Sequence, residues 1–378
     1  MSAWLFPQDA FAKEKPIKVI VDGAEVKLEK SAIVKNGYTY VPLTSIGEAL
    51  NKEIVWDQES WVVTIADRKS GQNIFVNLKT NKISVGDTIV DYDVFLHKGK
   101  TMVPVRLFAE YFHAKVGWNG KDRTVTIRSR DVIPILMYHS VNHKANSAVN
   151  TQPANFEKQM RAIKGAGYTT ITPFDLYNFY YNNGKLPENP ILITFDDGYR
   201  DNYTNAYPVL KKLNMQATIF LITSRIGHNG EQGYPNEIPK LSWEEIAEMG
   251  DLITVQSHTW DLHRKVSGKN GKPLSLLATP LNLNGKWETD AEYRARITND
   301  LRKSVETIKE KTGYESVILS YPYGDYNPTV IDVAKELGIK LGVTVKKGVN
   351  AHYSKEYELK RITVHGDYSG EALLQKLK

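Results

Sequence analysis

The sequence predicts an α/β protein: a distorted (β/α) barrel of seven or eight strands, preceded by a small α+β domain made from a duplicated unit. Two observations support this prediction. The first 130 residues contain an internal repeat, whereas the chain from residue 132 onward alternates apolar strands with amphipathic helices. Seven or eight successive strand–helix units favour closure of a parallel sheet into a barrel.

The repeat is ungapped, and every matched pair is offset by 62 residues. The matches are Gly37–Leu43 with Gly99–Val105, Trp56-Asp57 with Trp118-Asn119, and Val63–Ile65 with Val125–Ile127. Each unit is expected to form a strand, a short helix (Ser45–Leu50 or Leu107–Phe112) and a hairpin. The β-rich segments of this half are Ile17–Val21, Val62–Ile65, Ile74–Leu78 and Thr124–Ile127.

The second half supplies eight strand candidates with helices between them. They are Ile133–Tyr138, Thr169–Ile171, Ile191–Phe195, Ala217–Ile222, Leu252–Gln256, Val317–Tyr321, Leu341–Val345 and Arg361–Val364. Ser242 with Glu245, and Thr289 with Glu292, have the spacing of capping boxes at helix starts. The helix after Thr289 is expected to end at Gly313.

Composition excludes several classes of protein. The chain has 378 residues, 41% of them hydrophobic and 24% charged, which is ordinary for a globular protein of two domains. It contains no cysteine, so disulfides, zinc–thiolate sites and cysteine nucleophiles are excluded. No apolar run is long enough for a membrane span. The net charge is +6, but the basic residues are scattered and no nucleic-acid-binding motif is visible, so no nucleic-acid partner is expected.

The first 15 residues suggest export. Trp4-Leu5-Phe6 precedes Ala10-Phe11-Ala12, which is similar to the end of a secretory signal with a small-x-small cleavage site. A basic region and a full apolar region are missing, so residues 1–15 are either a clipped signal or a cloning remnant. We expect a secreted or cell-wall-associated bacterial protein, which a chain without cysteine suits.

Charged and imidazole side chains follow two of the expected strands. Asp196 and Asp197 come directly after Ile191–Phe195, and His258 and His263 follow the apolar run 252–255. Adjacent carboxylates repel each other unless a metal or a proton relieves the repulsion. One carboxylate and two imidazoles make a three-ligand set for a divalent metal with an open position, and the other carboxylate is then free to act as a base.

Residues 16–129 resemble the copper amine oxidase N-terminal-like module, or stalk domain. Despite that name we expect no copper site here, because His97 and His113 are isolated from other ligands. A structural spacer, or a module that associates with the cell wall, is the expected role.

Residues 132–378 resemble the polysaccharide deacetylases, carbohydrate esterase family four, by three motifs in the family order. They are Thr194–Tyr199, the segment containing His258 and His263, and Tyr321-Pro322-Tyr323-Gly324. The resemblance implies that Asp196 is the general base, that Asp197, His258 and His263 bind the metal, and that the backbone amide of Tyr323 binds the oxyanion. Zinc suits this ligand set best, and cobalt or nickel could replace it.

Three other residues are ambiguous. His365 lies near the position of the family's last motif and is our candidate for the acid that protonates the leaving amine, with a surface-loop histidine as the alternative. His139, at the end of the first barrel strand, either touches the site or caps the barrel mouth, and we favour the second interpretation. Trp260 is either a stacking surface for a sugar ring or buried packing.

The chain departs from the family pattern in three ways. The two histidines are five residues apart instead of four, which is similar to the branch that acts on poly-N-acetylglucosamine. Ser320 stands where the family usually has an arginine that pairs with the base, so Asp196 requires tuning by the metal or by another cation. The family's Asp-Trp motif has no convincing counterpart around Leu341–Val349.

We therefore expect metal-dependent removal of N-acetyl groups from a surface polysaccharide that contains N-acetylglucosamine, either a poly-N-acetylglucosamine-like polymer or peptidoglycan. The alternative is a catalytically weak or inactive glycan-binding protein of the cell wall. A copper oxidase is a third hypothesis, and it fails because the first domain has no histidine cluster. The N-acetylated glycan is the expected partner, with attachment to the wall or to surface polysaccharide through the N-terminal domain as a further hypothesis.

Overall fold

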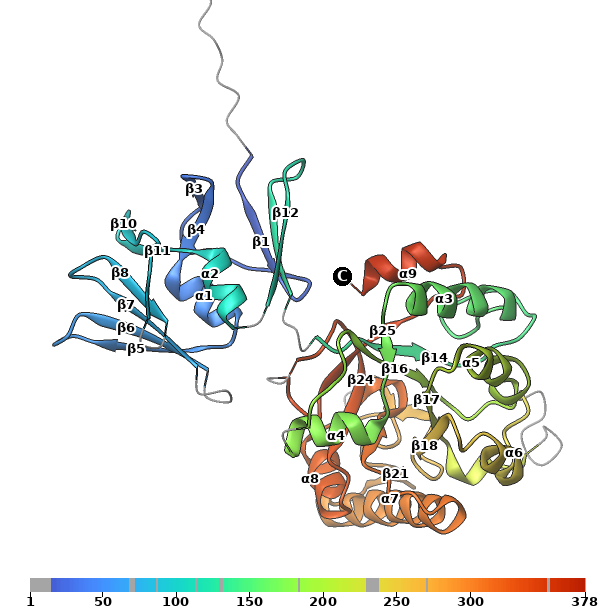
Figure 1. Cartoon of the computed structure of the whole chain (residues 1–378). Helices are drawn as coiled ribbons and strands as arrows, with labels where there is room; N and C mark the ends of the chain where they lie inside the picture. The colour runs from blue at the N-terminus through green and yellow to red at the C-terminus, as the bar shows by residue number, and fades with distance from the viewer. Residues whose placement is uncertain are drawn as a thin grey trace, which may run out of the picture. The chain divides into compact units, whose positions relative to one another are not determined.

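The protein is described by a computed structural model, which covers residues 15–67, 72–85, 88–112, 114–128, 132–182, 184–228, 238–269, 271–351 and 354–377. The chain divides into two compact units, with the boundary between residues 130 and 131 (Figure 1). Residues 1–14 of the suggested signal segment, and His113, lie outside the described residues. In the part of the chain that is described, no helix has both the length and the apolar character needed to cross a bilayer.

The N-terminal unit is built from short strands and two short helices. Its strands are β1 Lys18–Val21, β2 Ala24–Glu25, β3 Ile33–Lys35, β4 Tyr38–Pro42, β5 Glu53–Asp57, β6 Val62–Ala66, β7 Asn73–Asn77, β8 Lys82–Val85, β9 Thr88–Val90, β10 Phe95–His97, β11 Lys100–Pro104, β12 Lys115–Asn119 and β13 Thr124–Arg128. The helices are α1 Leu43–Ala49 and α2 Val105–Tyr111. The strands form three sheets, ordered β12-β13-β1-β2, β10-β11-β4-β3 and β5-β6-β7-β8-β9.

The structure reproduces the 62-residue repeat as an approximate two-fold arrangement. Strands β4 and β11 pair antiparallel, and Val41 lies directly opposite Val103, its equivalent in the repeat. Helices α1 and α2 follow these two strands and begin at equivalent residues, Leu43 and Val105. Both valines are fully buried in the core of the unit, so the duplicated sequence contributes to one shared core.

The C-terminal unit is a closed parallel barrel. Its strands are β14 Ile135–Tyr138, β16 Pro190–Phe195, β17 Ala217–Leu221, β18 Ile253–Ser257, β23 Ile318–Ser320, β24 Leu341–Lys347 and β25 Leu359–Thr363. Each strand pairs parallel with the next around the ring, and the ring closes because β14 pairs with both β16 and β25. The eighth predicted strand, β15 Thr169–Thr170, pairs with β16 outside the closed ring. The prediction of a seven- or eight-stranded barrel is confirmed.

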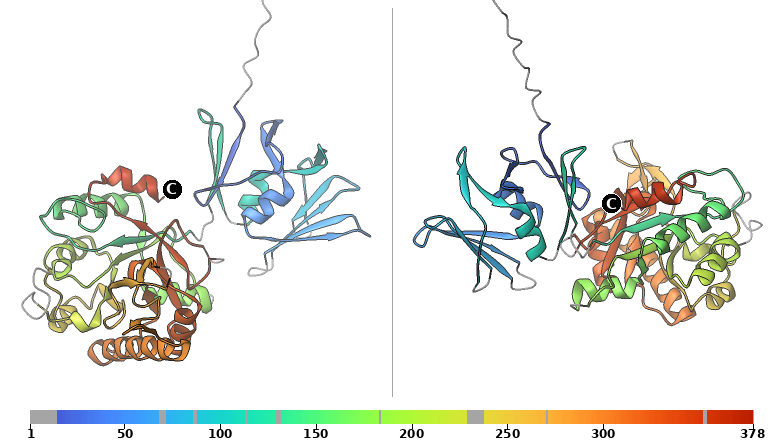
Figure 2. Two further views of the ribbon diagram at one scale, coloured as in Figure 1. Left: turned by 180° about the vertical axis from the view of Figure 1, so that it is seen from behind. Right: turned by 45° about the horizontal axis from the view of Figure 1, so that its top comes forward.

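Helices surround the barrel (Figures 1 and 2). They are α3 Pro153–Gly165, α4 Pro173–Tyr181, α5 Tyr207–Leu213, α6 Trp243–Glu248, α7 Asp290–Thr312, α8 Pro328–Glu336 and α9 Gly370–Lys376. Both predicted capping boxes are present, at Ser242 and Thr289, and Thr172 forms a third. Helix α7 ends at Gly313, whose φ of 74° is the left-handed conformation that suits glycine. Two small hairpins, β19 Lys265–Ser267 with β20 Pro273–Ser275 and β21 Asn282–Leu283 with β22 Lys286–Trp287, lie between β18 and α7.

Candidate metal centre and active site

Three side chains converge at the carboxyl ends of neighbouring strands. Asp197 follows β16, and His258 and His263 follow β18, so parallel pairing brings residues about sixty positions apart to one end of the barrel. Asp197 Oδ1 lies 3.3 Å from His263 Nε2 and 3.6 Å from His258 Nε2. One potential ligand atom from each of the three residues lies within 4.8 Å of the others. Among the described residues, this is the group with the residue types and geometry to hold a metal ion.

The geometry of this group fits a tetrahedral divalent metal. Two ligand atoms that bind a tetrahedral zinc at about 2.0–2.1 Å are roughly 3.3 Å apart, close to the separations observed. Asp197 Oδ1 is buried and has no hydrogen-bond partner, which is costly for a carboxylate oxygen unless a cation binds it. His258 Nδ1 lies 2.7 Å from the carbonyl oxygen of Ser320 and can donate its proton there. This bond leaves His258 Nε2 with a lone pair directed to the metal position.

Asp196 forms a bidentate ion pair with Arg361 of β25. Arg361 Nη1 donates to Asp196 Oδ1 at 2.7 Å, and Arg361 Nη2 donates to Asp196 Oδ2 at 2.8 Å. The guanidinium also donates to the Ser320 hydroxyl at 3.1 Å and to the Thr344 carbonyl at 2.9 Å. Arg361 is completely buried and Asp196 nearly so. The cation that the sequence pattern required for Asp196 is therefore this arginine, which comes from the last strand of the barrel.

Burial and charge act in opposite directions on the two aspartates. Burial alone would raise the pKa of Asp196, but the charge of Arg361 and its hydrogen bonds outweigh burial and hold that pKa well below its usual range. Burial likewise opposes ionisation of Asp197, and the neighbouring imidazoles of His263, His139 and His258 bring its pKa below the usual value. Burial, together with the charge of His258, lowers the pKa of His263 to about 4. Near neutral pH the site thus holds two carboxylates and a neutral His263, the protonation state that a metal requires of its ligands.

Three non-glycine residues at the strand ends adopt the left-handed backbone conformation. They are Asp197 with φ 77°, Thr259 with φ 76° and Tyr323 with φ 60°. Such residues cost about 1–3 kcal/mol each and persist only where the surrounding structure imposes them. The three follow β16, β18 and β23, the strands whose ends carry the three sequence motifs. Each of the three motifs therefore includes one residue with a strained backbone, although positive φ also occurs at ten other described non-glycine residues.

Tyr323 lies beside the candidate metal-binding group of Asp197, His258 and His263. Its ring centroid is 4.6 Å from that of His263, and Lys265 Nζ lies 4.8 Å from the centre of the Tyr323 ring. The side chain is 39% exposed, so it reaches solvent at the edge of the site. The next residue, Gly324, has φ 78°, and a Cβ atom there would lie 2.5 Å from Val345 Cγ2. The turn therefore requires glycine at position 324.

Comparison with known proteins assigns the barrel to a family. Residues 183–342 match the model of the polysaccharide deacetylase family. The chain is also 33% identical over 240 residues to the putative polysaccharide deacetylase YxkH of Bacillus subtilis, a match that covers 64% of this chain and 74% of the relative. The chain belongs to the polysaccharide deacetylase family. The barrel is therefore a polysaccharide N-deacetylase domain.

The deacetylase is also similar to one relative with a named activity and to one solved structure. A poly-β-1,6-N-acetyl-D-glucosamine N-deacetylase of Staphylococcus aureus is 29% identical over 245 residues, covering 64% of this chain and 77% of the relative. The solved structure of IcaB from Ammonifex degensii superposes with a TM-score of 0.54 at 27% identity, covering 65% of this chain and 97% of that structure. The N-terminal unit of the deacetylase matches the copper amine oxidase N-terminal domain over residues 20–135.

The structure separates His365, the predicted proton donor, from His139 by their surroundings. His139, after β14, is one of the charges that lower the pKa of both Asp196 and Asp197, and its Nδ1 is buried without a hydrogen-bond partner. His365 Nδ1 lies 3.2 Å from Asp367 Oδ2, and its ring contacts Tyr368. None of these contacts of His365 is with a residue of the metal-binding group. His139 therefore interacts with the two aspartates, whereas the contacts of His365 are with Asp367 and Tyr368.

A buried aspartate organises the loop that carries the two histidines. Asp300 of α7 accepts the backbone N–H of Trp260 at 2.8 Å and that of Asp261 at 2.9 Å. The Trp260 ring lies under Lys303, with Nζ 3.9 Å from its centre, so Lys303 covers one face of the indole. These contacts favour a packing role for Trp260 over a stacking surface for a sugar. No sequence motif pointed to Asp300, because its partners are backbone amides on a loop forty residues earlier.

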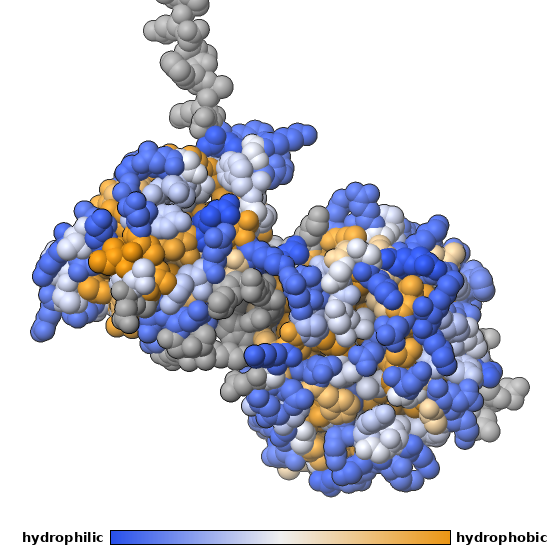
Figure 3. Space-filling view, viewed as in Figure 1, coloured by the Kyte–Doolittle hydropathy of each residue, from blue (hydrophilic) through white to orange (hydrophobic). Residues whose placement is uncertain are grey.

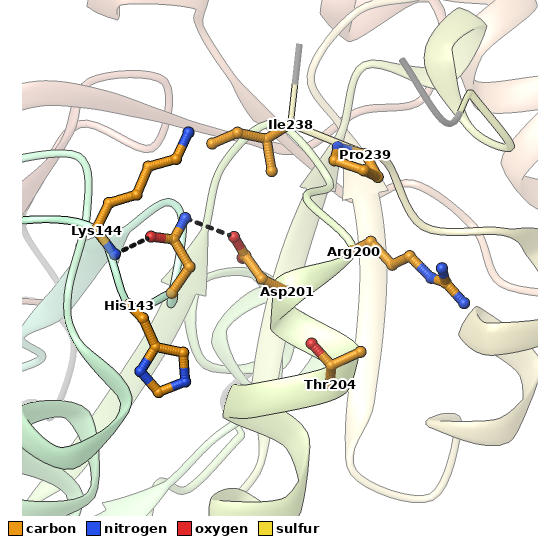
Figure 4. A pocket seen from close by; sticks show the side chains of 8 residues that line it. His143, Lys144, Arg200, Asp201, Thr204, Ile238 and Pro239 are labelled. Carbon is orange, nitrogen blue, oxygen red and sulfur yellow. Dashed lines mark hydrogen bonds between the residues drawn. The ribbon is translucent and has the colours of Figure 1, made fainter. Parts of the chain in front are cut away.

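A pocket of about 620 Å³ opens on the segments that follow β14, β16 and β17 (Figure 4). Strands β14 and β16 are those whose ends carry His139 and Asp197. His143 and Lys144 line one side, and Thr204 and Pro239 line another. Asp201 ties the first two segments together, because it accepts hydrogen bonds from the Ser140 hydroxyl, the Val141 amide and the Asn142 side chain. The deacetylase thus has a pocket on the loops next to the candidate metal centre.

Proposed function

We propose that this protein removes N-acetyl groups from an extracellular polysaccharide that contains N-acetylglucosamine, with a polymer of the poly-β-1,6-N-acetylglucosamine type favoured over peptidoglycan. The observation that carries the proposal is the Asp197, His258 and His263 group beside the Asp196–Arg361 pair. The similarity to the staphylococcal deacetylase supports the choice of polymer. The pocket lined by His143 and Lys144 supports a substrate longer than one sugar.

Asp197, His258 and His263 would hold the metal, and we propose zinc as the native ion. A divalent metal bound there lowers the pKa of water towards about 7 and polarises the acetyl carbonyl. Asp196 accepts a proton from the attacking water, and Arg361 keeps its carboxylate ionised and fixed in orientation. The backbone amide of Tyr323 donates to the oxyanion that develops on the acetyl oxygen.

The leaving amine must receive a proton, because it would otherwise depart as a very basic anion. His365 is the donor predicted from its sequence position, and His139 is the donor favoured by its closeness to both carboxylates. We propose that one of these two imidazoles gives the proton, and a pair of variants described in the Discussion distinguishes them.

The alternative, a glycan-binding protein without turnover, rested partly on the missing arginine before Tyr321. The Arg361–Asp196 ion pair supplies that charge from another strand, which favours the enzyme over the binding protein. We further propose that the protein acts outside the cytoplasm or at the cell surface, where such polymers occur.

Acetate release tests this function. The purified full chain, stripped of metal with a chelator and reloaded with zinc, is expected to release acetate from β-1,6-linked N-acetylglucosamine oligomers faster than from β-1,4-linked ones. Asp196→Asn should lower the rate by about 10²–10⁴-fold while the protein stays folded. If the wild type binds these oligomers but releases no acetate with zinc, cobalt or nickel, the glycan-binding alternative is correct.

A further inference from the structure

The N-terminal unit has an exposed aromatic pocket of its own. The pocket has a volume of about 230 Å³ and lies between strands of both repeats. Its lining residues include Val34, Tyr38, Pro104, Val105, Arg106 and Trp118. Tyr38 is 42% exposed and Trp118 is 48% exposed, so two aromatic side chains are open to solvent at one small hollow. Figure 3 shows hydrophobic residues reaching the surface of this unit in a broad area.

We propose that this Tyr38–Trp118 pocket binds a sugar ring of the polysaccharide, as a second glycan site separate from the barrel. A pyranose ring has apolar C–H faces and a rim of hydroxyl groups. The aromatic side chains of Tyr38 and Trp118 offer flat apolar surface for the ring faces. Arg106 brings N–H donors for the hydroxyl or acetyl oxygens at the rim.

Arg106 forms an ion pair with Glu110 that uses only part of its hydrogen-bonding capacity. Its Nη1 donates to Glu110 Oε1 at 2.9 Å, one helical turn further along α2. A guanidinium has five N–H groups, so donors remain for a ligand. Tyr38 is braced by Tyr92, with ring centroids 5.3 Å apart in an edge-to-face arrangement. Both side chains therefore have a neighbour that favours their present orientation before a ligand arrives.

The internal repeat provides a built-in comparison. The residues equivalent to Tyr38 and Arg106 in the other half are Lys100 and Thr44, whereas Trp118 corresponds to Trp56. In that other half of the repeat, Glu29 bridges Lys100 and Thr44. It accepts hydrogen bonds from Lys100 Nζ at 2.8 Å and from the Thr44 hydroxyl at 2.5 Å.

The two halves have thus diverged at the residues that would recognise a sugar, while the tryptophan is present in both. Trp56 packs edge-to-face against Trp61, with ring centroids 6.0 Å apart. It is 46% exposed, almost the same as Trp118. Trp56 is consequently a matched control for Trp118, because it has the same type, exposure and place in the repeat.

The test uses the full chain in its metal-free form, so that acetate release cannot change the ligand. The probe is a short β-1,6-linked N-acetylglucosamine oligomer, and the readout is the NMR signal of each tryptophan indole N–H, assigned by single Trp→Phe variants. The Trp118 signal should shift in a saturable manner, and the Trp56 and Trp61 signals should not. Arg106→Gln and Tyr38→Ala should each weaken the affinity read at Trp118 by about five- to tenfold.

Retention on the insoluble polymer gives a second measurement. Trp118→Ala should reduce retention at least fivefold relative to Trp56→Ala, and both variants should keep wild-type NMR dispersion. If Trp118 does not shift with up to 10 mM oligomer, or if the two tryptophan variants reduce retention equally, the pocket is not a glycan site. Binding of an apolar peptide without any sugar response would also overturn the proposal.

The choice of polymer rests on the proposed function, but the site does not. A Trp118 shift in a protein that releases no acetate would support the glycan site and contradict the proposed deacetylase activity. Acetate release without a Trp118 shift would support the activity and contradict the glycan site.

Discussion

Arg361, in the last strand of the barrel, neutralises Asp196, which follows the second closed-ring strand, through two parallel hydrogen bonds of 2.7 and 2.8 Å. The two residues are 165 positions apart, and the third group at this junction is the Ser320 hydroxyl, 3.1 Å from the guanidinium. Ser320 occupies the place where the family pattern has an arginine. A positive charge therefore reaches Asp196, the proposed base, from a different strand.

Removing this arginine should impair both stability and catalysis. Arg361→Gln leaves the Asp196 carboxylate buried without a counter-charge, which should cost about 3–5 kcal/mol in the free energy of unfolding. Acetate release should fall at least 100-fold. Urea unfolding and the rate of acetate release measure the two effects.

A double variant separates loss of charge from general damage. Ser320→Arg combined with Arg361→Ser returns the cation to the position usual in the family, next to the same carboxylate. We expect it to recover much of the activity lost in Arg361→Ser. If the double variant is no more active than the single one while it is folded, the position of the charge, and not only its presence, is essential.

The proton donor is distinguished by two parallel variants. If His139 protonates the leaving amine, His139→Gln should lower kcat by about 10²–10⁴-fold while zinc content stays unchanged, and His365→Gln should have little effect. The opposite result would support the donor predicted from sequence. Equal activity of both variants and the wild type would show that neither imidazole is the donor.

The proposed metal ligands lead to a prediction that does not depend on catalysis. Zinc should raise the Tm of the metal-stripped wild type, because it binds the folded site and not the unfolded chain. His258→Ala and His263→Ala should lose this shift and should bind less than one zinc ion per chain. His365→Ala should keep both properties. A zinc-dependent Tm shift that survives in His263→Ala would place the metal elsewhere.

Asp300 should make stability depend on pH in a direction opposite to that of most carboxylates. Burial raises its pKa to about 6, and the hydrogen bonds from the backbone amides of Asp261 and Trp260 only partly offset this. Its unfolded pKa is about 3.9, so between about pH 4 and pH 6 the folded state binds more protons than the unfolded state. The contribution of Asp300 to stability therefore decreases as pH rises through this window, by at most about 3 kcal/mol.

Asp300→Asn isolates this contribution, because the variant cannot ionise at that position. The stability of the wild type relative to Asp300→Asn should be higher at pH 4.5 than at pH 7.5, as measured by urea unfolding at both values. A difference that is constant with pH would mean that Asp300 ionises normally.

The secondary-structure elements of the barrel could be predicted from the sequence. The seven strands of the closed ring appear where the apolar runs predicted them, because a strand buried on both faces must be nearly continuous in apolar residues. The capping boxes at Ser242 and Thr289, and the helix end at Gly313, depend on contacts within a few residues. The convergence of Asp197, His258 and His263 was also predicted, because carboxyl ends of parallel strands meet at one edge.

What the sequence alone could not decide was which distant residues meet across the closed barrel. Arg361 was visible as a charge on an expected strand, but its pairing with Asp196 depends on the order of β25, β14 and β16 around the ring. Asp300 recognises backbone amides, which carry no sequence signature. Sequence determined the elements and the ligand types through local periodicity and spacing. Tertiary structure determined the charge partner of Asp196, because barrel closure joins the last strand to the first.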